Sequence, residues 1–207
     1  MQNRPSTGPG IVEQHRGLVP LYLSVMVSEW ALLYFVWVGG LRRTGTPLRG
    51  LIGGKWATPK DVLLDAGVAV GFWIVVEMAL WAVKFALGPD SAKSIEVLLP
   101  QGPLEISIWV ALSLTAGFCE EVVFRGYLQK QFLALTGSAT FAVLLQAVVF
   151  GVSHGYQGMR QVVVISVYGL LYGLLAQWRH SLRPGMIQHA GEDIFSGIVV
   201  RLLAATR

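Results

Sequence analysis

Long apolar runs separated by short polar connections dominate the chain. A bilayer core of about 30 Å is crossed by about 20 mostly apolar residues in a helix. By this measure the pattern predicts about six spans, so we expect an all-α fold, a polytopic bundle of transmembrane helices. The expected spans are Leu18–Val38, Val62–Leu87, Leu104–Phe118, Ala139–Ser153, Val162–Trp178 and Gly185–Leu203.

The segment ahead of the first span has a different composition. Residues 1–17 read "MQNRPSTGPGIVEQHRG", a polar stretch rich in Pro and Gly. Such a stretch buries too little apolar surface to fold by itself, and we expect a disordered arm. No later polar linker is long enough to separate two domains. Residues 18–207 are therefore expected to form a single integral membrane domain.

Composition and charge support the membrane class. Hydrophobic residues make up 54% of the chain and charged residues 14%, whereas soluble domains carry about 25% charge. The formal net charge of +4 is concentrated in the connection between the first two expected spans. Basic loops of this kind lie on the cytoplasmic side, so the charge does not indicate a nucleic-acid partner. We expect a multi-pass protein of a bacterial-type cell membrane. The basic residues of this connection are Arg42, Arg43, Arg49, Lys55 and Lys60.

The single cysteine, Cys119, excludes an intrachain disulfide and a cysteine-rich zinc site. It lies directly before two glutamates, which raises the question of a thiol nucleophile. A free cysteine among apolar neighbours more often packs as a small hydrophobe. We expect Cys119 to be buried.

Charge interrupts the apolar pattern most abruptly at "CEEVVFR". Glu121 and Arg125 are four residues apart, so on a helix they share a face and can form an ion pair. Glu120 lies about 100° around the helix and then has no local cation. A carboxylate in this situation holds its proton more tightly, which suits a general acid or base. The alternative is an ordinary solvated helix end at the membrane surface.

Two further polar clusters lie in later spans. In "FGVSH", Phe150 and His154 are four residues apart at the end of the fourth span. In "HAGED", His189 and Asp193 share a helical face inside the sixth span. Each cluster has a structural alternative: His154 as a hydrogen-bonding residue at a helix end, and the His189–Asp193 pair as a tie between helices.

A shared polar cavity explains the three clusters together, because polar groups in hydrocarbon need partners. We expect the third, fourth and sixth spans to converge and to face Glu120, His154 and His189 inward. A carboxylate with two imidazoles can activate water. The same three residues are also a possible zinc ligand set, although the H-E-x-x-H motif is absent. Glu29 and Glu77 lie in the first two spans without a local partner, and the sequence does not assign them a role.

The three motifs in this order resemble the CPBP family of membrane proteases. This family comprises the CAAX prenyl endopeptidases and the bacteriocin-processing, "abortive infection" proteins. The resemblance covers roughly Leu104 to Leu203 and rests on "EEVVFR", "FGVSH" and "HAGED". The prenyl proteases typically carry Asn at the last motif position, where this chain has Asp193. They also have eight helices, more than the spans expected here.

The resemblance implies an intramembrane endopeptidase that needs no cofactor. By position, Glu120 would be the base that activates water and His154 would orient that water. His189 and Asp193 would stabilise the oxyanion. The residues expected to support the site are Glu121, Arg125 and Phe150.

The implied substrate is a peptide or protein of the bilayer, of the CAAX type or the leader and bacteriocin type, with or without an attached lipid. One alternative is a non-catalytic membrane scaffold or immunity protein. The other is a zinc-dependent membrane protease that uses Glu120, His154 and His189 as ligands.

Overall fold

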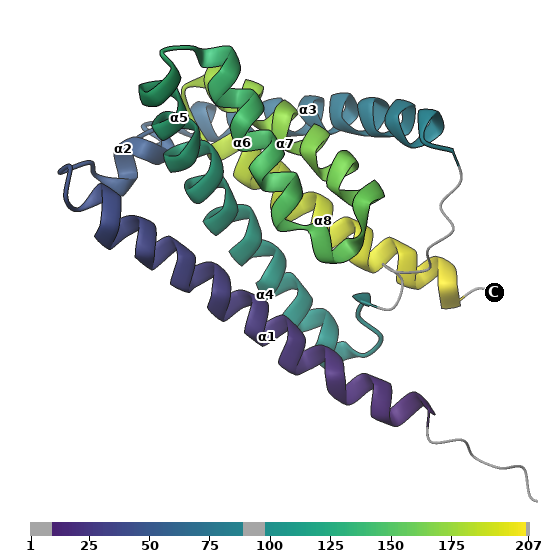
Figure 1. The fold of residues 1–207 in the computed structure, drawn as a ribbon. Coiled ribbons are helices and arrows are strands. Elements are labelled where there is room, and N and C mark those ends of the chain that lie inside the picture. Colours follow the sequence, from purple (N-terminus) through teal and green to yellow (C-terminus); the bar gives the residue numbers. More distant parts are fainter. Residues whose placement is uncertain (1–9, 89–97, 206–207) are drawn as a thin grey trace, which may run out of the picture.

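The computed structural model describes residues 10–88 and 98–205, and in these ranges it is all-α (Figure 1). The helical elements are α1 (Gly10–Val36), a π-helical turn (Trp37–Leu41), α2 (Leu48–Ile52), α3 (Pro59–Ala86), α4 (Pro103–Glu120), a π-helical segment (Glu121–Leu128), α5 (Gln129–Thr136), α6 (Ala139–Ser153), a 3-10 turn (Gly155–Gln157), α7 (Met159–Arg179) and α8 (Arg183–Ala205). The fold class predicted from the sequence is confirmed.

Four helical stretches of the described residues are long and apolar enough to cross a membrane. They are Leu18–Leu41, Pro59–Ala86, Pro103–Thr136 and Met159–Arg179. They correspond to the first, second, third and fifth expected spans and make the chain a multi-pass membrane protein. The fourth expected span, Ala139–Ser153, is an apolar helix of 15 residues, about 22 Å long. The sixth coincides with α8, whose polar side chains make it less apolar than the other four. A count of six spans therefore stays a prediction.

The helix that carries the two glutamates extends much further than the third expected span. It runs without a break for 34 residues from Pro103 to Thr136, with Glu120 and Glu121 near its middle. Pro103 occupies the first helical position, where its missing N–H costs nothing. Gly137, at φ 64°, ends the helix in a left-handed conformation that suits glycine. The charged stretch is therefore no frayed end of a span.

The polar arm expected at the N-terminus is partly helical. Helix α1 begins at Gly10, so residues 10–17 continue the first span toward the N-terminus. Glu, Gln and Arg in this stretch are good helix formers, and a helix already nucleated by the apolar span extends at little cost. Residues 1–9 of the predicted arm lie outside the described residues, and the single-domain boundary at residue 18 stays a prediction.

Two apolar clusters hold the helices together. The larger one joins α1 to the central helix and to Phe150 of α6, with Leu33, Val36, Cys119 and Val122 among its buried members. The smaller one joins α3 to α7. Figure 1 shows α1 lying along one side of α4, and α8 running beside α4 on the other side. Cys119 is 1% exposed, which confirms the expectation of a buried hydrophobe.

Candidate active site

The ion pair predicted within the glutamate motif is present and buried. Nη1 of Arg125 donates to Oε1 of Glu121 over 2.9 Å, and the two side chains are 0% and 1% exposed. The solvated helix end considered from the sequence is therefore wrong for these two residues. They lie in the π-helical segment that begins at Glu121, a rare local geometry that is often found at functional sites.

Two aromatic rings enclose the guanidinium of Arg125. Its central carbon lies 4.1 Å from the ring centre of Phe150 and 5.1 Å from that of Tyr172. Cation–π attraction to a ring is strongest where the cation is desolvated, as here. Phe150 thus links α6 to the motif helix. Glu121 and the two rings together compensate a charge that would otherwise be costly in the bundle interior.

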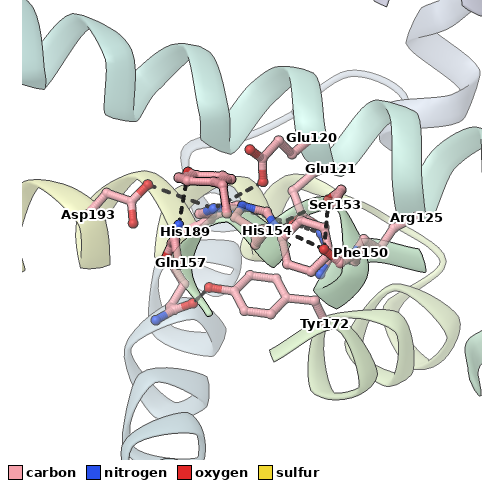
Figure 2. Close-up of polar contacts among 12 residues, drawn as sticks. Glu120, Glu121, Arg125, Phe150, Ser153, His154, Gln157, Tyr172, His189 and Asp193 are labelled. Carbon is pink, nitrogen blue, oxygen red and sulfur yellow. Dashed lines mark hydrogen bonds and ion pairs between the residues drawn. The ribbon is translucent and has the colours of Figure 1, made fainter. Parts of the chain in front are cut away.

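His189 of α8 contacts both glutamates of the motif, through different ring nitrogens. Its Nδ1 lies 3.1 Å from Oε1 of Glu121, and its Nε2 lies 3.8 Å from Oε2 of Glu120. Nε2 also lies 3.8 Å from Oδ2 of Asp193, one turn further along α8. Figure 2 shows Glu120 and Asp193 both pointing toward the His189 ring. The spacing-based expectation that His189 and Asp193 share a face is confirmed.

The hydrogen-bond partners of His189 fix its tautomer. An ionised carboxylate only accepts hydrogen bonds, so Nδ1 carries the proton that is donated to Glu121. Nε2 then faces Glu120 and Asp193. It is an acceptor in the neutral ring and a donor in the imidazolium ring.

The two adjacent glutamates lie in different surroundings. Glu121 is fully enclosed and accepts from both Arg125 and His189. The side chain of Glu120 is 17% exposed, and its ion pair within 4 Å is the one with His189. Glu120 therefore has the greater freedom to exchange a proton with a bound molecule.

His154 ends α6 and joins the group through Phe150. Its Nδ1 lies 2.9 Å from the backbone oxygen of Phe150 and 3.2 Å from Oγ of Ser153. Since a carbonyl only accepts, Nδ1 carries the proton and Nε2 is left as an acceptor. The Phe150 ring centre lies 4.9 Å from that of His154 and 6.4 Å from that of His189. One aromatic ring thus contacts both imidazoles. The hydrogen-bonding role considered for His154 is present, and it leaves Nε2 available.

Close backbone approach positions these helices. A Cβ added at Gly117 of α4 would lie 2.9 Å from Ala190 and 3.0 Å from the backbone oxygen of Met186, both on α8. A Cβ at Gly151 of α6 would collide with Ser166 of α7. Glycine at Gly117 therefore lets α8 approach the motif helix closely enough for His189 to reach the glutamates.

Three residues near the site had no role predicted from the sequence: Tyr172, Gln188 and Glu29. Tyr172 contacts Arg125, and its ring centre lies 5.5 Å from that of His189. Its hydroxyl donates to Gln188. An uncharged tyrosine in an apolar span carries no signal that separates it from an ordinary core residue. Glu29 was noticed but unassigned: it interacts electrostatically with Glu120, His189 and Asp193, and its Oε2 is buried without a hydrogen-bond partner among the described residues.

Glu77 does not join this group. It lies near Glu192 of α8. In the part of the chain that the structure describes, no three His, Cys, Asp or Glu residues are grouped closely enough to hold a metal ion. Glu120, His154 and His189 do not form such a group as they are arranged, and the zinc alternative stays a hypothesis.

A comparison with protein-family models places the motifs in a known family. Residues 102–195 match the model described as Rce1-like, type II CAAX prenyl endopeptidase Rce1-like. These residues form an Rce1-like domain. The domain begins just before α4 and includes every motif residue from Glu120 to Asp193, so the resemblance stated from the sequence is confirmed. Helices α1, α2 and α3 lie outside it. No curated protein and no solved structure matches the chain.

Proposed function

We propose that the protein is an intramembrane endopeptidase that hydrolyses peptide bonds with water activated by Glu120 and His154. The Rce1-like domain implies a CAAX-type endopeptidase and a protein substrate. The observation that carries the proposal is that the two adjacent glutamates have different partners and different exposure. Glu121 is saturated by Arg125 and His189, whereas Glu120 is partly exposed beside Nε2 of His189.

In this mechanism Glu120 accepts one proton from water, and Nε2 of His154 accepts a hydrogen bond from the other O–H. The oxygen attacks the carbonyl carbon of the peptide bond and forms a tetrahedral intermediate. When the C–N bond breaks, Glu120 returns its proton to the leaving nitrogen. General acid–base catalysis of this kind contributes about 10²–10⁴-fold.

His189 is proposed to stabilise the oxyanion. With Nδ1 bonded to Glu121, Nε2 donates only when the ring is an imidazolium. Glu121, Glu120 and Asp193 all lie near this ring and balance that charge. An ionised Asp193 cannot donate to an oxyanion, so its proposed role is to orient His189.

Glu121, Arg125 and Phe150 are proposed to hold the site in place without touching the substrate. The substrate would be a membrane-associated peptide, of the CAAX or the leader and bacteriocin type, that enters between α4, α6 and α8 from the bilayer. A six-span arrangement with a cavity at this position, in a bacterial-type cell membrane, belongs to the same proposal.

The proposal is tested by comparing new peptide termini in membranes that contain wild type, Glu120→Gln or Glu77→Gln at equal abundance. Termini that appear with wild type and Glu77→Gln, and are absent with Glu120→Gln, support a protease with Glu120 as base. A zinc chelator is added in a parallel set. Termini lost to the chelator and restored by zinc favour the metal-dependent alternative. New termini that are identical in all three membranes contradict Glu120 as the base, and the absence of new termini in all three favours a binding role.

A further inference from the structure

A hollow of about 420 Å³ lies apart from the candidate site, between the connection that follows α2 and the first turns of α8. Its lining includes three cations, Arg49, Lys55 and Arg183, together with Trp56 and the apolar Met186 and Ile187. The motifs recognised in the sequence contain none of these residues.

The floor of the hollow is a fixed charged network. Asp65, 2% exposed, lies 3.0 Å from Nε of Arg183 and 3.3 Å from Nη2 of Arg179. Nε1 of Trp56 donates to the same carboxylate over 2.8 Å, and the Arg183 guanidinium lies 5.2 Å from the Trp56 ring centre. Each of these side chains is thus held by a partner. The α7–α8 connection is joined to the end of α2 at this place, because the Leu182 N–H donates a hydrogen bond to the Ile52 carbonyl over 2.9 Å.

The network has an excess of positive charge. One carboxylate, Asp65, faces two guanidiniums, and Nη1 of Arg183 is buried without a hydrogen-bond partner in the described part of the chain. Arg49 and Lys55 at the rim are exposed, and no ion pair within 4 Å joins either to a carboxylate in the described ranges. Asp61 of α3 also interacts electrostatically with Arg183, so four cations lie near two carboxylates. The remaining excess of positive charge attracts an anion.

A second hollow of about 550 Å³ shares Trp56 with the first and is mainly apolar. Val62 and Leu63 of α3 line it and are 40% and 72% exposed. The cationic hollow and the apolar hollow thus meet at one tryptophan. They lie where α3 and α8 begin and α7 ends, which is the end of the bundle with the basic connection. Tryptophan and basic residues gather at this depth of a membrane.

We propose that these two hollows bind one anionic phospholipid, with the phosphate between Arg49, Lys55 and Arg183 and an acyl chain along Val62 and Leu63. A basic pocket between transmembrane helices suits a lipid phosphate, and each nearby Lys or Arg contributes to the attraction. A free anion would use the charged hollow but would leave the adjoining apolar one unused. This inference does not depend on the proposed proteolysis.

The test uses the purified full-length protein in phosphatidylcholine nanodiscs with a graded fraction of phosphatidylglycerol, and measures lipid retention and the unfolding midpoint. The double variant Arg49→Gln/Lys55→Gln removes two lining cations. The matched control Arg43→Gln/Lys60→Gln removes the same charge from the same connection outside the hollow. Neither pair makes an ion contact that the fold needs in the described residues.

We expect phosphatidylglycerol to raise the unfolding midpoint of the wild type and of the control variant. We expect its affinity for the Arg49→Gln/Lys55→Gln variant to be about thirty-fold weaker than for the wild type. Equal weakening of both variants, or of neither, overturns the site. Two competition arms distinguish the sources of the anion. Inorganic phosphate that stabilises the protein as well as the lipid does overturns the lipid assignment. The lipid assignment is also overturned if a peptide with a free C-terminal carboxylate displaces the lipid and the same peptide with an amidated C-terminus does not.

Discussion

Nδ1 of His189 and Nη1 of Arg125 share one acceptor, Oε1 of Glu121, at 3.1 and 2.9 Å. The second glutamate of the motif therefore joins α8 to the central helix, and the first is left to face Nε2 of His189. The two neighbouring carboxylates are expected to respond very differently to the same substitution.

Glu121→Gln is predicted to destabilise the fold, whereas Glu120→Gln leaves stability nearly unchanged. Removing the charge of Glu121 leaves Arg125 buried without its counter-ion, which costs about 3–5 kcal/mol. The Glu120 side chain is 17% exposed and has no comparable partner to lose. Unfolding of both variants is measured in the same detergent. A Glu121→Gln protein as stable as wild type would show that the buried pair does not hold this site.

The close contact of α4 with α8 is predicted to depend on Gly117. Gly117→Ala places a methyl group 2.9 Å from Ala190, and overpacking of this kind costs about 1–3 kcal/mol. The displacement also separates His189 from the glutamates, so activity falls with stability. Gly191→Ala is the control, because a Cβ there meets no atom within 4 Å. Stability is measured by denaturant unfolding, and equal behaviour of the two variants would refute the packing argument.

The ring of Phe150 is predicted to stabilise the buried guanidinium. Phe150→Leu removes the aromatic face 4.1 Å from Arg125, an interaction worth about 2 kcal/mol when desolvated. Phe141→Leu on the same helix is the control, since that ring is 60% exposed. The difference in unfolding free energy between the two variants measures the effect. A difference near zero would mean that Glu121 and Tyr172 compensate Arg125 without the Phe150 ring.

Asp193 is predicted to act by orienting His189. Asp193→Asn keeps a polar side chain at the same position and retains most activity. Asp193→Ala releases the imidazole and lowers kcat by about 10²-fold, the typical effect of a misplaced catalytic group. The KM is expected to stay near its wild-type value, because Asp193 is proposed to act through His189 and not on the substrate. A rise in KM with unchanged kcat would instead make Asp193 a binding residue.

The local parts of the site could be predicted from the sequence. The Glu121–Arg125 and His189–Asp193 contacts follow from helical spacing, which depends on nothing beyond one helix. The preference of His189 for Glu121 could not be predicted. It depends on how α4 and α8 are rotated and how closely they approach at Gly117, which is a property of tertiary packing.

For the fold, too, the local helices could be predicted from the sequence and the contacts between distant residues could not. Apolar runs predicted helices where helices are found, because hydrocarbon requires internally bonded backbone. The uninterrupted helix through Glu121 and Arg125 was only partly foreseen, because polar and charged residues interrupt its apolar pattern from Glu120 onward, although residues 121–126 are buried in the bundle. Tyr172 and the network around Asp65 gave no signal, as each depends on residues far apart in the chain.

The most direct measurement of the central claim uses purified Glu120→Gln protein reconstituted with a peptide that wild type cleaves. The account predicts that the variant binds the intact peptide with wild-type affinity and unfolds at the wild-type midpoint, while cleavage falls by about 10²–10⁴-fold. Cleavage at the wild-type rate by this folded, substrate-binding variant would contradict Glu120 as the base that activates water.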